Sequence, residues 1–261
     1  MILERLRCLS GKWIRRDSLL WKVMAALYPM LRHLFRKRLA REKISRYMDS
    51  RVQGDEVRVI VGGHWHDDTD WLMLSETEQD ITRPLNFGDA SIDVLFTEHV
   101  IEHVDLAGAL QFLKEANRVL KHGGVLRIVC PTIERLIGAP LDDDNGRTYI
   151  ENSLIAPWSR EHTLLRELKL SGIFEAPKTF QLNALFTRYG HRFIWSSDLL
   201  VRVLRAIGFR QARIMPIGEG IRPEYCIERR RRGLYLGHDR DVDRSVEPVF
   251  DAESEAIEAV K

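Results

Sequence analysis

The sequence is poor in cysteine, and its cysteines do not form a CxxC pair. Only Cys8, Cys130 and Cys226 occur among 261 residues. A disulfide scaffold and a cysteine zinc site both need several cysteines at close, regular spacing, so both are excluded. We therefore expect a reducing, cytoplasmic location.

Long apolar runs are also lacking. The most apolar N-terminal stretch, residues 19–35, is interrupted by Lys22, Pro29 and Arg32. It is shorter than the roughly 20 apolar residues that a membrane-spanning helix needs, and no secretory leader is visible. With 44% hydrophobic and 30% charged residues, the composition excludes collagen-like, disordered and multi-span membrane classes. The length suits one α/β domain with additions.

The charge is unevenly distributed along the chain. Residues 1–51 hold 14 Lys and Arg against 4 Asp and Glu, so this segment carries +10 while the whole chain carries +2. Apolar residues recur at helical spacing from Leu19 to Leu34, which predicts a basic amphipathic helical arm. Two interpretations stay open: an extension docked on the body, or peripheral contact with an anionic membrane.

The body, residues 52–261, alternates short apolar runs with amphipathic segments. Helices are expected over 106–120, stopped by Gly123-Gly124, and over 198–206, between Ser196 and Gly208. Residues 132–190 are irregular and form a variable acceptor or lid region. The alternation predicts an α/β, Rossmann-like, doubly wound and mostly parallel sheet. Its expected strands are 57–61, 71–74, 91–96, 125–129, 211–215 and 255–260.

Polar and glycine residues follow the first two expected strands. Gly62 and Gly63 would let the backbone approach a nucleotide-like ligand closely, although a plain tight turn explains them equally well. Glu76 lies near the end of the second strand, and Asp80 follows it. A carboxylate there could accept hydrogen bonds from ribose hydroxyls.

Two histidine clusters are candidate metal sites. His64-Trp65-His66-Asp67 resembles a metallo-hydrolase motif, but Thr69 stands where its last histidine belongs. His99-x-x-Glu102-His103 spells the inverted zinc-protease motif, yet it directly follows a strand and lacks an evident third ligand. No metal is expected, and a metal-dependent hydrolase is the least favoured alternative.

Two longer segments carry a family resemblance. Residues 92–103 and 118–131, with His122 in place of the usual proline, resemble the class I S-adenosylmethionine-dependent methyltransferases of the type 11 group. Residues 61–63, 70–71, 79–82 and 191–195 are similar to a small-molecule or sugar branch of that group. The resemblance covers about residues 57–261 and implies a seven-stranded sheet with the arm as an N-terminal helical extension.

The resemblance implies S-adenosylmethionine as the cofactor and a small-molecule acceptor, in particular a sugar or glycolipid hydroxyl. The general base for a hydroxyl acceptor would be a histidine, with His99, His103 and His191 as candidates in that order. The alternative is a non-catalytic scaffold of the same fold, or a membrane-associated protein. Nucleic acid is not an expected partner because the body is acidic. The residues expected to bind the cofactor are Gly62, Gly63, Glu76, Asp80, Ile81, Glu98 and His99.

Overall fold

A computed structural model describes residues 34, 36–62, 70–138, 163–164, 167–168, 177–187, 190–230 and 253–261. Most of the predicted arm, the second glycine Gly63, the cluster at residues 64–69 and most of the variable region lie outside these residues. Membrane contact by the arm therefore stays a prediction. Among the described helices, none combines the length and apolar character needed to cross a bilayer.

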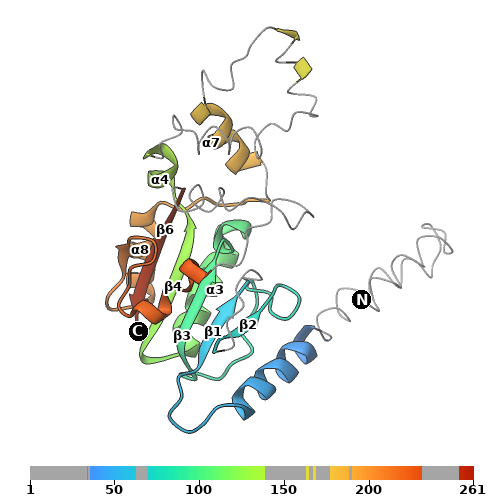
Figure 1. The fold of residues 1–261 in the computed structure, drawn as a ribbon, viewed down its shortest axis with the longest axis vertical. Coiled ribbons are helices and arrows are strands. Elements are labelled where there is room, and N and C mark those ends of the chain that lie inside the picture. Colours follow the sequence, from blue (N-terminus) through green and yellow to red (C-terminus); the bar gives the residue numbers. More distant parts are fainter. Residues whose placement is uncertain are drawn as a thin grey trace, which may run out of the picture.

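The core of the fold is one mixed sheet (Figure 1). Its strands lie in the order β2-β1-β3-β4-β6-β5. The first four run parallel, and β6 runs antiparallel to both β4 and β5. This confirms a mostly parallel α/β sheet. The strands are β1 (Arg58–Val61), β2 (Leu72–Leu74), β3 (Ile92–Glu98), β4 (Leu120–Pro131), β5 (Arg213–Met215) and β6 (Ser254–Val260).

The expected seventh strand is not found among the described residues, which supply six strands. The fully described segment between β2 and β3 forms turns instead of a further helix and strand. Side chains within this segment form hydrogen bonds with its backbone groups. The Gln79 amide donates to the Asp80 carbonyl at 2.9 Å and accepts from Asn86, and Asp80 Oδ1 accepts from the Thr82 amide at 3.0 Å. A strand there would break these local bonds.

The two predicted amphipathic helices are confirmed as α3 (Leu106–Val119) and α8 (Ser197–Ile207). Ser196 caps α8, and Gly208 ends it in the left-handed conformation at φ 117°. The expected stop of the first helix at Gly123-Gly124 is wrong. Because β4 begins directly after Val119, those glycines lie inside the strand.

The two faces of the sheet are covered differently. The buried sides of α3 and α8 join one core cluster, and Tyr47 of the helix over residues 36–49 joins the same cluster. The opposite face packs against Tyr225 and Ile227, which belong to the short 3-10 turns η3 (Pro223–Tyr225) and η4 (Ile227–Arg230). Among the described residues, α-helices therefore pack on one face of the sheet, which departs from the doubly wound expectation.

The end of the predicted arm is docked on the body. The Tyr47 hydroxyl donates to the Asp70 carbonyl at 3.0 Å and accepts from the Arg58 amide at 3.2 Å. Lys43 pairs with Glu78 at 3.2 Å. The docked interpretation thus holds for residues 36–49, where the arm meets the sheet edge.

The described parts of the variable region lie beyond the carboxyl end of β4 (Figure 1). Helix α4 (Ile133–Gly138) follows β4 directly, and α7 (Pro177–Thr187) packs on it through Leu136 and Leu185, with Ile194 completing the cluster. In parallel α/β sheets this edge is where ligands bind. The two helices therefore border the expected site.

Candidate functional site

Three strands end level with one another at the carboxyl edge of the sheet. Val61 pairs with Leu74, and Ile60 pairs with Phe96. Gly62 and Ser75 follow β1 and β2, and Glu98 ends β3, so the three residues lie at one edge. The Gly62 amide donates to the Leu74 carbonyl at 2.8 Å.

The Gly62 turn needs a glycine for two separate reasons. Its φ is +90°, in the region that side chains disfavour. A Cβ built on it would also lie 2.2 Å from Val100 Cγ2. The loop that follows β3 therefore packs directly against the turn that follows β1, so a ligand at this edge would contact both.

The carboxylate that binds the Ser75 turn after β2 is Glu78, which is not among the residues predicted from the sequence. Glu76 lies in an exposed turn, whereas Glu78 Oε2 accepts from the Ser75 amide at 2.8 Å and also from the Ser75 hydroxyl. Burial alone would raise the pKa of Glu78, but the Ser75 hydrogen bonds and the Lys43 charge hold it below its ordinary value. The spacing Ser75-x-x-Glu78 matches a capping box, and this signal could have revealed it.

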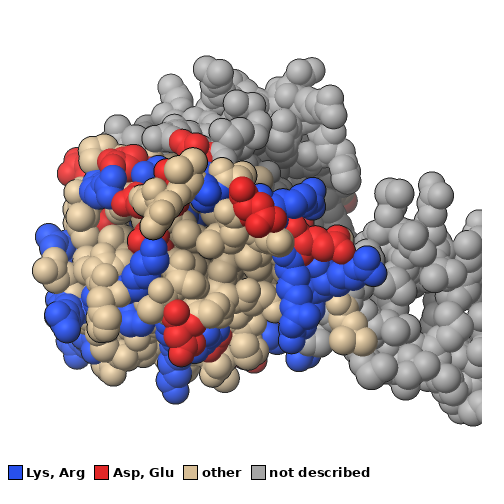
Figure 2. Space-filling view, turned by 90° about the horizontal axis from the view of Figure 1, so that it is seen from below, with Lys and Arg blue, Asp and Glu red and all other residues tan. Residues whose placement is uncertain are grey.

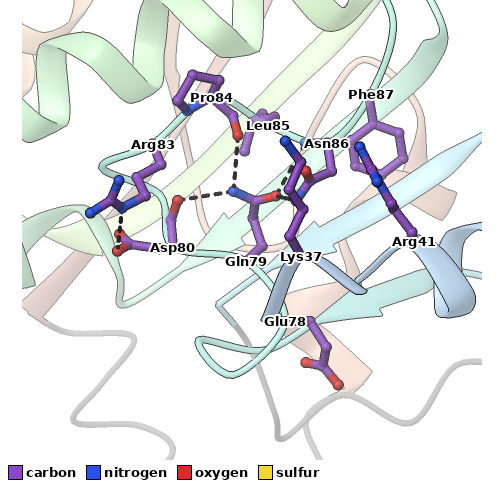
Figure 3. A pocket seen from close by; sticks show the side chains of 10 residues that line it. All are labelled: Lys37, Arg41, Glu78, Gln79, Asp80, Arg83, Pro84, Leu85, Asn86 and Phe87. Atoms are coloured by element: carbon purple, nitrogen blue, oxygen red, sulfur yellow. Dashed lines mark hydrogen bonds and ion pairs between the residues drawn. The ribbon is translucent and has the colours of Figure 1, made fainter. Parts of the chain in front are cut away.

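A cavity of about 480 Å³ lies beside this turn (Figure 3). Of the predicted cofactor residues that the structure describes, Asp80 alone lines it, while Ile81 is buried. Asp80 Oδ2 lies 3.7 Å from Arg83 Nε. The structure therefore does not bring all predicted cofactor residues into one cavity. The lining residues are Lys37, Arg41, Glu78, Gln79, Asp80, Arg83, Pro84, Leu85, Asn86 and Phe87.

His99 directly follows β3 and has both ring nitrogens against protein partners. Its Nδ1 lies 3.2 Å from Glu102 Oε1, and its Nε2 lies 3.2 Å from Ser254 Oγ. Burial alone would lower the pKa of His99, but the Glu102 carboxylate raises it above the ordinary value, with help from Glu98. This geometry makes His99 a positioning residue for Glu102, not the first candidate for a base.

Glu102 and His103 belong to the short turn η1 (Ile101–His103), which meets His191 across the edge. One ligand atom from each of Glu102, His103 and His191 lies within 4.8 Å of the others. The Arg192 and Phe193 amides donate to the Glu102 carbonyl at 2.7 and 3.2 Å, which fixes the segment carrying His191. Two of the three predicted catalytic histidines are thus brought together.

The two histidines differ in environment. His191 Nδ1 lies 2.8 Å from the Leu185 carbonyl, so it carries the proton and Nε2 carries the lone pair. Burial and the nearby His103 lower the pKa of His191, although Glu102 opposes them. The His103 side chain is 38% exposed and can reach a ligand from solution. A neutral imidazole beside an accessible one can accept a proton from a bound hydroxyl.

The comparison with protein families gives one match. The family described as "Methyltransferase domain" matches residues 38–128, about a third of the chain. No curated protein matches the chain. The match begins inside the docked helix and ends inside β4, so it contains Gly62, Glu78 and the η1 turn.

Several solved structures resemble the chain at low identity. They include a methyltransferase from Archaeoglobus fulgidus (15% identity, 90% of this chain, 99% of that one, TM-score 0.40). Another is a methyltransferase from Thermotoga maritima (15% identity, 92% of this chain, 99% of that one, TM-score 0.36). A third is human N-acetylserotonin methyltransferase (13% identity, 79% of this chain, 40% of that one, TM-score 0.36). These scores are too low to carry an argument.

The residues at the strand ends fit the cofactor of that family. Gly62 supplies a tight turn at the end of β1, and Ser75 with Glu78 supplies oxygen atoms at the end of β2 that could accept from ribose hydroxyls. Thr97 Oγ1 is a buried polar atom at this edge with no hydrogen-bond partner among the described residues. The domain match, on a mixed Rossmann-like α/β sheet, thus supports an S-adenosylmethionine-dependent methyltransferase of class I.

Proposed function

We propose that this protein transfers a methyl group from S-adenosylmethionine to a hydroxyl of a small molecule such as a sugar or glycolipid. The observation that carries the proposal is the cluster of Glu102, His103 and His191 beside the Gly62 turn. Both lie at the edge where parallel α/β sheets bind their ligands. A proton acceptor and the expected cofactor turn therefore share one edge.

The chain's own contribution is positioning and proton removal. When bound, the cofactor supplies an electrophilic methyl group for an in-line displacement, whose rate depends strongly on orientation. The neutral His191, or the exposed His103, accepts the hydroxyl proton, and the buried Glu102 carboxylate stabilises the imidazolium that forms. A positioned base of this kind contributes roughly a hundredfold or more to the rate.

One face of the molecule favours a small acceptor over nucleic acid. Figure 2 shows one face of the molecule, where Lys and Arg side chains are interspersed with Asp and Glu. A nucleic-acid site would instead gather basic side chains into a patch. The acceptor would enter beside α4 and α7, which border the histidine cluster through Leu185.

The first experiment measures cofactor binding by calorimetric titration of S-adenosylmethionine and its demethylated product into the full chain. We expect micromolar binding by the unaltered protein. Glu78→Ala should weaken it at least about tenfold, since a lost charged hydrogen bond costs 1.5–3 kcal/mol. Glu76→Ala is the matched control, because its side chain lies in an exposed turn. The reverse ranking would restore Glu76 as the ribose ligand, and no binding up to millimolar would favour the non-catalytic scaffold.

The second experiment measures transfer of labelled methyl groups to a panel of sugars and glycolipids. His191→Gln should lower kcat by about a hundredfold while cofactor affinity stays unchanged. His122→Asn, at an exposed histidine in β4, is the control and should behave as the unaltered protein. Transfer to amines but not hydroxyls would overturn the proposed acceptor chemistry.

A further inference from the structure

The Glu102 carboxylate is fully buried beside two imidazoles. Its side chain has no exposed surface, and Oε2 has no hydrogen-bond partner among the described residues. His99 Nδ1 and His103 Nε2 lie 3.2 and 3.9 Å from Oε1 as ion-pair neighbours. Burying a carboxylate is costly unless a cation and further hydrogen bonds compensate it. His99, whose pKa Glu102 raises, is one such partner of Oε1, whereas Oε2 has none among the described residues.

Two imidazoles, those of His103 and His191, lie beside this carboxylate. The His103 and His191 rings meet edge to face, with centroids 4.8 Å apart. The Leu185 carbonyl accepts from His191 Nδ1 at 2.8 Å, so the lone pair is on Nε2. Metal-binding histidines are commonly held in this way, with the other ring nitrogen donating to a carbonyl. Figure 1 shows α7, which carries Leu185, beyond the strand ends.

We propose that Glu102, His103 and His191 bind one divalent transition-metal cation. Two imidazole nitrogens and one carboxylate form a mixed set that suits zinc, manganese, iron or cobalt and not the oxygen-liganded calcium or magnesium. Their ligand atoms lie within 4.8 Å of one another. A bound ion would draw them to roughly 3.3 Å, the spacing around a tetrahedral zinc, and His103 has the exposed surface to move.

The sequence motif pointed to a different ligand set. His99-x-x-Glu102-His103 would use both histidines if it were an inverted zinc-protease motif. In the structure, His99 lies before the turn and contacts Ser254 and Glu102 instead. The third ligand comes from His191, far along the chain, because the amides after it bind the Glu102 carbonyl. The proposed ligand set therefore differs from the motif in using His191 in place of His99.

The cation would leave coordination positions open, since the protein supplies only three ligands. A role in activating the acceptor hydroxyl rests on the proposed function. There the cation would lower the pKa of a bound hydroxyl, and this activation would replace the proton transfer to His191 or His103 that is proposed for the metal-free protein. Cation binding itself does not depend on that role.

The test uses the full chain after treatment with a chelator, without cofactor or acceptor. Zinc, manganese and magnesium are titrated in separate calorimetric runs, and cobalt is followed by its visible absorption. We expect one zinc or manganese per chain and much weaker magnesium binding. His103→Asn and His191→Asn should each weaken zinc binding by more than about tenfold, as even outer-shell changes do. The exposed His122→Asn is the matched control and should bind as the unaltered protein.

Three results would overturn the proposal. They are absence of binding up to millimolar metal, unchanged binding in both ligand variants, and loss of binding in a His64→Asn/His66→Asn variant alone. Circular dichroism of each variant verifies that it is folded. Metal binding is measured independently of methyl transfer. Metal binding without transfer would contradict only the proposed function, and transfer without metal binding would contradict only this inference.

Discussion

The protein buries charged side chains on both faces of β4, and the two groups are built in opposite ways. Arg127 projects toward the face covered by the 3-10 turns and has no exposed surface. Its guanidinium binds Glu228, Glu258 at 3.2 Å and the Glu219 carbonyl at 3.0 Å. The second oxygens are also used, because Glu258 accepts from the Ile221 amide at 2.8 Å.

The Glu102 group lies toward the other face, near Cys130, whose thiol pKa is raised by burial and by the Glu102 charge. Here a fully buried carboxylate faces His99 and His103 through Oε1, and its Oε2 has no hydrogen-bond partner among the described residues. The comparison teaches that complete pairing marks the charge that holds the fold, whereas incomplete pairing marks the charge that is available for function.

The largest expected effect is on the complete group. Arg127→Met leaves Glu228 and Glu258 buried without their cation, so the free energy of unfolding should fall by about 3–5 kcal/mol. Urea denaturation at neutral pH measures it. Arg202→Ala is the control, because its pair with Asp198 is 74% and 64% exposed and should contribute under about 0.5 kcal/mol. If both variants lost a similar, small amount of unfolding free energy, the Arg127 group would not hold the fold in the way proposed.

The second prediction concerns the Gly62 turn. Gly62→Ala adds a Cβ that overlaps Val100 and forces a side chain into the left-handed region. Overpacking of this kind costs roughly 1–3 kcal/mol, to which the backbone strain adds about 1 kcal/mol. The double variant Gly62→Ala/Val100→Ala should recover stability by removing the overlap. If the double variant is less stable than Gly62→Ala, the contact with Val100 is not the cause.

The third prediction concerns the start of α8, where Glu134 accepts from the Ser196 hydroxyl at 2.7 Å and from the Ser197 amide at 3.0 Å. Burial would raise the pKa of Glu134, but these hydrogen bonds lower it below its ordinary value of 4.5. Its stabilisation is therefore present above pH 4.5 and is lost as the pH falls through the folded-state pKa.

Glu134→Gln should accordingly lower the free energy of unfolding by about 1 kcal/mol near neutral pH, the usual worth of a helix cap. The difference from the unaltered protein should shrink below pH 4.5. Denaturation curves at several pH values measure this. A difference that grows in acid would show that the carboxylate charge is not what stabilises the helix.

Local periodicity predicted much of the fold. The strands and the helices α3 and α8 appear where apolar spacing placed them, because each buries one face locally. The described residues supply six strands, and the hydrogen bonds of Gln79 and Asp80 that hold the segment between β2 and β3 in turns could not be read from apolar spacing. The meeting of His191 with Glu102 depends on long-range docking of the two segments, which spacing in sequence does not encode.

The smallest expected effect on stability is that of a substitution at Glu102. Glu102→Gln removes the carboxylate that lies 3.2 Å from His99 Nδ1, but His99, unlike Arg127, can lose its proton, so no uncompensated charge is left buried. We expect the free energy of unfolding of the chelator-treated protein to change by less than about 1 kcal/mol in either direction. Urea denaturation in parallel with Arg127→Met measures the contrast directly. A loss as large as that of Arg127→Met would mean that Glu102 also holds the fold, and incomplete pairing would then not distinguish a functional carboxylate from a structural one.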